Sequence, residues 1–294
     1  MARPIRKGSD SIPVWVLRAV WLVQPVTLGP ALADGLNDLD GRTFLSVAVW
    51  VLWGLGLLAT LVPRPVTLTA IRIGGPAAAA LSVWTATAVD DTTLVVVGLV
   101  GAFVLGVLSH WPAVADACVD GASYGDEKRF LLRAPGPVVL ALGPIAWALT
   151  VAGVVTGPLL LASGDPAVGS AACVAGLPIA VASVRALHHL HRRWIVLVPA
   201  GFVLHDHLAL ADPTLLPRDA IASVGPAPAD TDAHDLTQAA RGLLLEVRCR
   251  EPHDLRPASR DGSAEVVVTE AFLCAPTRPD AVLAEAKRRR LPVG

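Results

Sequence analysis

Six long apolar stretches fill the first two-thirds of this chain and constrain its fold more than any other feature. Crossing the roughly 30 Å hydrocarbon core of a bilayer takes about 20 helical residues, and each stretch is close to that length. The strands of a membrane barrel would alternate apolar and polar residues, so these uniformly apolar runs predict helices. The predicted spans are Ile12–Gly29, Thr43–Val62, Val66–Ala86, Thr92–Ser109, Pro137–Leu161 and Val168–Val184.

The composition supports a membrane protein and excludes one class of partner. Hydrophobic residues make up 53% of the chain and charged residues 17%, with a mean hydropathy of +0.57. These values lie outside the range of soluble globular domains. The net charge is −1, so the basic footprint of a nucleic-acid-binding protein is absent from the sequence.

Charged residues in the loops set the predicted orientation. Basic residues fall in alternate loops, namely Arg3, Arg6 and Lys7, then Arg64, then Lys128, Arg129 and Arg133, and finally Arg185, Arg192 and Arg193. The other loops carry Asp34, Asp38, Asp40, Asp90, Asp91 and Asp165, with Arg42 as their one basic residue. Cytoplasmic loops are enriched in Lys and Arg. We therefore expect a multi-pass protein of the cytoplasmic membrane with both termini in the cytoplasm.

The first apolar stretch has a second interpretation as a cleaved signal peptide. Basic residues precede it, and Ala31-Leu32-Ala33 is similar to a cleavage site. Arg18 interrupts the apolar segment that a signal peptide would need, and this favours a retained span.

Two charged residues, Arg18 and Arg72, lie inside predicted spans. Each is about two turns from the cytoplasmic end of its helix, so its side chain could extend to the interface. The alternative is a functional role, because charged residues within a membrane usually mark a site. No acidic residue falls near the middle of a span, and this argues against an ion-coupled carrier.

Glycine and proline interrupt the third and sixth spans at Gly74-Gly75-Pro76 and Gly176-Leu177-Pro178. Broken helices at matching positions of two halves are typical of transporters that bind substrate near the midplane. Pro76 and Pro178 are therefore candidate functional residues. Kinked packing is the alternative, since both residue types are common in membrane helices.

The composition changes at Arg185–Arg193, which predicts a helical membrane domain over 1–193 and a β-rich cytoplasmic domain over 194–294. Period-two patterns and turn residues indicate its strands. The predicted strands are Trp194–Val198, Phe202–His205, Thr214–Leu216, Ala220–Val224, Leu243–Cys249 and Glu265–Thr269. A final helix is expected to begin after an N-cap at Thr277.

Basic side chains near the membrane are the candidate contacts for a partner or for anionic lipid. The loop that ends at Arg133 mixes charged and apolar residues, as interfacial segments do; fixing the topology is its other explanation. The candidates are Lys128, Arg129, Arg133, Arg192, Arg193, Lys287, Arg288, Arg289 and Arg290.

The order of several strands followed by one helix resembles the bacterial pleckstrin-homology-like (PH-like) domains of membrane proteins. The resemblance rests on the patterns at 194–205, at 216–224 and at 274–286, and it covers about a third of the chain. The whole chain is similar to actinobacterial membrane proteins with such a tail. The resemblance implies a small sandwich or barrel capped by a helix, with a binding or scaffolding role and no chemistry of its own.

Motifs for zinc-dependent proteolysis and for phosphate binding are absent from the sequence. Neither HExxH nor GxxxxGK[ST] occurs. Two histidine groups, at 188–191 and 205–207, could ligate zinc, but no cysteine pair or carboxylate stands at ligand spacing. We expect no catalytic residue, no cofactor and no metal.

Together these features favour a non-enzymatic inner-membrane protein whose cytoplasmic PH-like domain acts at the membrane face. The domain is expected to scaffold a membrane or cytosolic protein partner, or to bind lipid headgroups. A small-molecule or lipid transporter that uses broken helices is the alternative, and a membrane-embedded enzyme is a third hypothesis.

Overall fold

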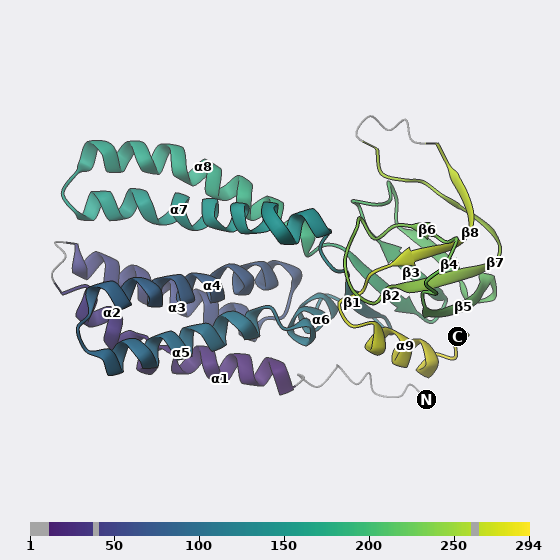
Figure 1. The fold of residues 1–294 in the computed structure, drawn as a ribbon, viewed down its shortest axis with the longest axis horizontal. Coiled ribbons are helices and arrows are strands. Elements are labelled where there is room, and N and C mark those ends of the chain that lie inside the picture. The colour runs from purple at the N-terminus through teal and green to yellow at the C-terminus, as the bar shows by residue number, and fades with distance from the viewer. Residues whose placement is uncertain (1–11, 38–40, 260–264) are drawn as a thin grey trace. The chain divides into compact units, whose positions relative to one another are not determined.

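A computed structural model describes residues 12–37, 41–259 and 265–294. The basic residues Arg3, Arg6 and Lys7 and the acids Asp38 and Asp40 lie outside the described residues. The chain forms two compact units (Figure 1). The helical unit contains the described residues up to Cys118 together with Gly143–His188, and the β unit contains Val119–Leu142 and His189–Gly294.

Six helical segments in the described residues are long and apolar enough to cross a membrane, as the sequence predicts. The first joins α1 (Ile12–Thr27) to α2 (Gly29–Gly35), and a π-helical turn, Val138–Leu142, precedes α7 (Gly143–Ala162). The other four are α3 (Arg42–Leu61), α4 (Pro65–Ala88), α5 (Thr92–Ser109) and α8 (Pro166–Leu190). The chain is therefore a multi-pass membrane protein.

Small residues allow the helices of the helical unit to pack closely. Gly153 of α7 faces Gly176 of α8, and a Cβ atom at Gly153 would lie 2.4 Å from the Gly176 carbonyl oxygen. A Cβ atom at Gly75 of α4 would lie 2.1 Å from Oγ of Ser109, where α5 ends. Dispersion contacts at such close approaches drive helix association in lipid, where burial of apolar surface gives no advantage.

The helices are not interrupted at Pro76 or Pro178. Helix α4 runs without interruption through Pro76, and α8 runs through Pro178. Neighbouring helices and adjusted backbone geometry let membrane helices tolerate proline. The helices therefore lack the half-helix ends that the transporter alternative requires.

Two four-stranded sheets make up the β unit (Figure 1). The first has the order β1-β2-β3-β4, and its strands are β1 (Lys128–Leu131), β2 (Trp194–Val198), β3 (Gly201–His205) and β4 (Thr214–Pro217). The second has the order β5-β7-β8-β6, with β5 (Ile221–Pro226), β6 (His234–Asp235), β7 (Leu245–Leu255) and β8 (Val267–Cys274). Helix α9 (Pro279–Arg288) follows, so a β-rich domain with a final helix is confirmed.

Strand β1 comes from the loop between the fourth and fifth spans, outside the residues predicted for this domain. It pairs antiparallel with β2, with Lys128 opposite Leu197 and Leu131 opposite Trp194. Phe130 of this strand enters the core beside Ile195. The β unit thus includes residues 119–142 in addition to the predicted 194–294. A four-residue strand is recognised only through its pairing partner, which here lies far along the chain.

The core of the β unit lies between the two sheets and α9. Phe202 of β3 and Phe272 of β8 are fully buried, with ring centroids 6.3 Å apart. Val282 and Ala286 bury one face of α9 in the same core. Helix α9 begins one residue later than predicted, because Arg278 rather than Thr277 occupies the N-cap.

Candidate functional site

Several basic residues that were predicted as external contacts form ion pairs inside the β unit. Lys128, the first residue of β1, forms an ion pair with Asp120, which precedes the strand. Arg129 pairs with Glu127, with 2.7 Å between Nη2 and Oε1. The Arg129 guanidinium also lies 5.3 Å from the centroid of the Trp194 ring. These contacts reduce the charge that the segment offers to an external ligand.

Arg193 and Arg133 hold the β unit together at the start of β2. Arg193 is fully buried, and its Nε and Nη2 donate to the two carboxylate oxygens of Asp206 at 2.6 and 2.7 Å. Its Nη1 donates to the carbonyl oxygen of Arg133 at 3.0 Å. Arg133 in turn donates to the carbonyl oxygen of Arg241 at 2.8 Å. A Cβ atom at Gly242 would lie 1.9 Å from Nη1 of Arg133, so glycine leaves room for this side chain.

Arg288 and Arg289, at the end of α9, are also neutralised internally. Nε of Arg288 donates to Oε2 of Glu285 at 2.6 Å, and Nε of Arg289 donates to Oε1 of the same residue at 2.6 Å. Nη2 of Arg289 pairs with Asp126 at 3.0 Å. The remaining candidates, Arg192, Lys287 and Arg290, are exposed.

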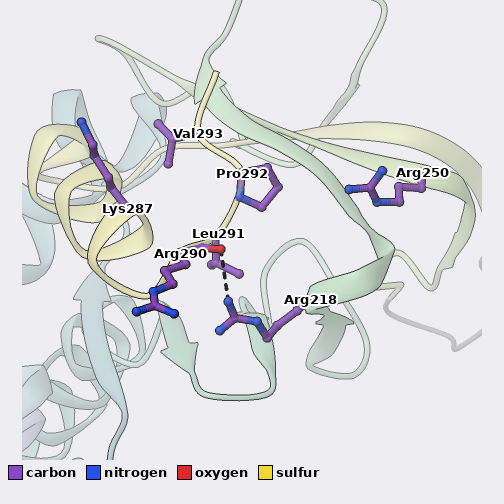
Figure 2. Close-up of a pocket in the computed structure, with 7 residues that line it drawn as sticks. All are labelled: Arg218, Arg250, Lys287, Arg290, Leu291, Pro292 and Val293. Atoms are coloured by element: carbon purple, nitrogen blue, oxygen red, sulfur yellow. Dashed lines mark hydrogen bonds between the residues drawn. The ribbon is translucent and has the colours of Figure 1, made fainter.

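Lys287 and Arg290 line a hollow of about 640 Å³ on the β unit, together with two arginines that are not among the predicted contacts. We call it the basic hollow. Figure 2 shows its four basic side chains arranged around the segment 291–293. Its lining residues are Arg218, Arg250, Lys287, Arg290, Leu291, Pro292 and Val293.

Arg218 is held in place from the other side of the hollow. Its Nη2 donates to the carbonyl oxygens of Arg289 and Arg290 at 2.7 and 3.1 Å (Figure 2 marks the contact with Arg290). Its Nη1 lies 3.4 Å from the carbonyl oxygen of Pro199. A guanidinium has five N–H donors, so donors remain for a ligand. The carbonyl groups orient the side chain without neutralising it.

Arg290 occupies a backbone conformation that normally selects glycine. Its φ is 59°, in the left-handed region. The amide of Leu291 donates to the carbonyl oxygen of Ala286, and the amide of Arg290 to that of Lys287, each at 2.9 Å. These are the two hydrogen bonds of a Schellman helix end, where glycine is usual. Strain of this kind is often retained at functional sites, and here it places a cation at the hollow.

The charge of the basic hollow is uncompensated within the part of the chain that the structure describes. Four of its seven lining residues are basic and none is acidic. Among the described residues, none of these four side chains forms an ion pair. Four cations from three segments of chain around one hollow can attract an anion, and arginine suits phosphate because its planar donors match the phosphate oxygens.

The histidines and cysteines do not assemble a reactive centre in the described residues. Within 12–37, 41–259 and 265–294, no group of three His, Cys, Asp or Glu side chains is placed to hold a metal ion. The rings of His189 and His207 meet edge-on at 5.5 Å, and His205 stacks on Trp194. Burial raises the pKa of the Cys274 thiol to about 12, so it remains protonated and unreactive at neutral pH.

The two charged residues within the spans have different surroundings. Arg18 of α1 is buried, and its Nε donates to the carbonyl oxygen of Thr60 in α3 at 3.0 Å. Its guanidinium also lies 4.8 Å from the ring centroid of Trp15. Arg72 of α4 is partly buried, and its Nε has no hydrogen-bond partner among the described residues. Neither arginine lines the basic hollow, and neither Pro76 nor Pro178 does.

Sequence reasoning missed Arg218 and Arg250 because no local pattern marks them. Arg218 follows β4, and Arg250 lies in β7 where its pairing with β8 shifts register. Such an irregularity can turn a side chain away from the regular alternation of a strand. The three consecutive arginines at 288–290 are visible in the sequence, but only the structure separates Arg290 from the two that pair with Glu285.

Comparisons with known proteins do not identify this chain. No family model matches it, and neither a curated protein nor a solved structure does.

Proposed function

We propose that this chain is a non-enzymatic protein of the cytoplasmic membrane whose β unit, a PH-like domain, binds anionic lipid headgroups in the cytoplasm. The uncompensated charge of the basic hollow is the observation that carries the proposal. In this role the domain would organise proteins at the membrane face, and both termini would be cytoplasmic, as the basic loops indicate.

Surface electrostatics favours a headgroup as the ligand. The cytoplasmic leaflet carries anionic lipids, and each Lys or Arg close to it contributes about 1 kcal/mol of attraction. Arg250, Lys287 and Arg290 are exposed and therefore available to phosphate oxygens. The segment 291–293 adds an apolar floor against which the carbon part of a headgroup could pack.

A recruitment assay tests the proposal with the full chain. The protein is placed in nanodiscs of phosphatidylcholine, and vesicles are added that contain phosphatidylglycerol or phosphatidylcholine alone. We expect cosedimentation with the anionic vesicles only, and we expect it to weaken as salt is added because exposed charges are screened. Equal recovery with both vesicle types would reject headgroup binding.

Arg290→Gly is the most informative variant for this assay. Glycine suits the left-handed position, so the variant should fold at least as stably as the parent while it loses a cation from the hollow. Arg256→Gln is the matched control, since Arg256 is an exposed arginine of the β unit outside the lining. Vesicle binding that survives Arg290→Gly but is lost in Arg256→Gln would place the site elsewhere.

A further inference from the structure

One charged side chain of the helical unit lacks an acceptor within the part of the chain that the structure describes. Arg72 lies inside α4, and its Nε atom is buried without a hydrogen-bond partner. No hydrogen bond or ion pair joins its guanidinium to any described residue. A guanidinium stays charged in proteins and carries five N–H donors. Charged residues within a membrane almost always pair with another group, so this side chain calls for an acceptor from outside the protein.

Arg18 of α1 is the comparison within the same unit. Its Nε donates to the carbonyl oxygen of Thr60 at 3.0 Å, and its guanidinium lies 4.8 Å from the ring centroid of Trp15. The helical unit therefore can satisfy an intramembrane arginine with its own groups. It does not do so for Arg72 within the described ranges.

The position of Arg72 in α4 brings its charge close to the membrane surface. Helix α4 begins at Pro65, so Arg72 lies about 10 Å from that end at 1.5 Å per residue. Helical side chains slant toward the N-terminus of their helix, and a long arginine side chain can extend to the headgroup level. Gly75, one turn deeper in α4, packs against Ser109, where α5 ends. The guanidinium of Arg72 therefore lies near the level at which α5 leaves the bilayer.

The residues that follow α5 are at the outer surface of the helical unit. Helices α4 and α5 lie side by side (Figure 1), and His110 and Trp111 come directly after α5. Both are exposed, and His110 interacts electrostatically with Arg72. Tryptophan is enriched at the headgroup level of a bilayer. An acceptor that reaches Arg72 from this side would therefore belong to the headgroup layer.

The nearest carboxylate does not replace that acceptor. Asp116 lies on α6 (Pro112–Asp120), which follows Trp111, and it interacts electrostatically with Arg72. It is buried, and it forms no ion pair with Arg72. A separated charge of this kind favours the cation without engaging its donors.

Phosphate is the acceptor that fits a guanidinium at this level. The phosphodiester of a phospholipid carries a single negative charge, which one guanidinium balances. The planar donors of arginine match two phosphate oxygens at once. The attraction is also stronger than in water, because the effective dielectric constant falls near a protein and away from bulk solvent. Sugar headgroups lack this charge.

We propose that Arg72 binds the phosphate group of a phospholipid that packs beside α4 and α5, and that this lipid stabilises the helical unit. The site is separate from the basic hollow, which belongs to the β unit, and it does not depend on the function proposed for that hollow. Free phosphate offers the same chemistry, and the experiment separates the two sources.

The test measures the melting temperature of the delipidated full chain in a nonionic detergent, from the loss of helical circular dichroism. Phosphatidylcholine should raise it by about 3 °C or more, because a ligand that binds only the folded state stabilises that state. A galactolipid with the same acyl chains lacks phosphate and should leave it nearly unchanged. Equal shifts with the two lipids would overturn the proposal. An equal shift with inorganic phosphate alone would also overturn it, since the ligand would then be a soluble anion.

Variants assign the effect to Arg72. Arg72→Gln should abolish the shift with phosphatidylcholine and should melt no lower than the parent without lipid, because no described residue loses a hydrogen bond. Arg42→Gln is the matched control, since Arg42 is the exposed first residue of α3. Arg290→Gly controls for the basic hollow, and both controls should keep the shift. A shift that persists in Arg72→Gln would overturn the proposal. Lower melting of Arg72→Gln without lipid would do the same, because it would reveal a partner within the chain.

Discussion

The two units of this protein differ in how many of their large apolar side chains face outward. In the helical unit, Phe103 of α5 is 68% exposed, whereas Phe272 in the β unit is fully buried. The span that ends in α7 has 6% of its most apolar window buried inside the protein. Lipid tails are as apolar as these side chains, so exposure to them costs little. Residue types that form the core of the β unit therefore also cover much of the outer surface of the helical unit.

Both units bury leucines, but they differ in their other buried contacts. Gly153 and Gly176 bring the backbones of α7 and α8 into contact, whereas the β unit buries phenylalanines and an ion pair. Burial of apolar area from water drives the second kind of packing and is absent from the first. Mutations should therefore act through different physical terms in the two units.

The largest loss of stability should come from separating β1 from the rest of the β unit. A fragment of residues 193–294 lacks Phe130 and Leu132 of the core and the pairing partner of β2. We expect it to lose cooperative thermal unfolding, measured by circular dichroism. A fusion of 119–133 through a short linker to 193–294 should restore it, since Leu131 lies opposite Trp194. Equal melting of the two fragments would show that β1 is dispensable.

Breaking the buried ion pair of Arg193 and Asp206 should cause the next largest loss of stability. Arg193→Ala leaves the Asp206 carboxylate buried without its partner, which typically costs about 3–5 kcal/mol. Arg288→Ala is the comparison, because Arg288 is 64% exposed in its pair with Glu285 and such pairs contribute about 1 kcal/mol or less. Protease susceptibility of the β unit in the full chain measures both changes. Equal protection of the two variants would contradict the prediction.

The difference between lipid and water as surroundings can be tested by replacing one phenylalanine with alanine in each unit. Phe272→Ala should destabilise the β unit by about 3–5 kcal/mol, because it opens a cavity in the core. Phe103→Ala should change stability little in a bilayer, since that side chain faces outward. Urea titration of the full chain in nanodiscs, followed by proteolysis of each unit, gives the two values. A large loss for Phe103→Ala would mean that α5 packs against a further partner.

The smallest loss of stability is expected from a substitution that tests close packing in the helical unit. Gly153→Ala places a methyl group 2.4 Å from the Gly176 carbonyl oxygen, so α7 and α8 must move apart. Overpacking of this kind typically costs about 1–3 kcal/mol. Gly54→Ala is the control, since a Cβ atom at Gly54 meets no atom within 4 Å. Resistance to heating in detergent should fall for the first variant alone; equal resistance would show that the contact yields easily.

Local patterns predicted the individual elements better than the boundaries between units. The six spans and the strands near Trp194, Phe202 and Leu245 are visible because length and periodicity mark them. Strand β1 is not, since its four residues follow a charged turn and pair with a strand more than sixty positions away. At Pro76 and Pro178 the sequence left two interpretations open, broken helices or kinked packing, and the helices continue through both residues.

By itself, the sequence determined that the chain crosses a membrane and carries a β-rich domain with a final helix. Those properties depend on hydrophobic runs and short-range periodicity, which each segment carries alone. Only the tertiary structure decided that residues 119–142 belong to the β unit and that Arg218, Arg250, Lys287 and Arg290 share one hollow. Whether an arginine is neutralised depends on which carboxylate folding brings beside it. The chain order at 288–290 cannot distinguish Arg289, paired with Asp126, from Arg290, held at a left-handed helix end.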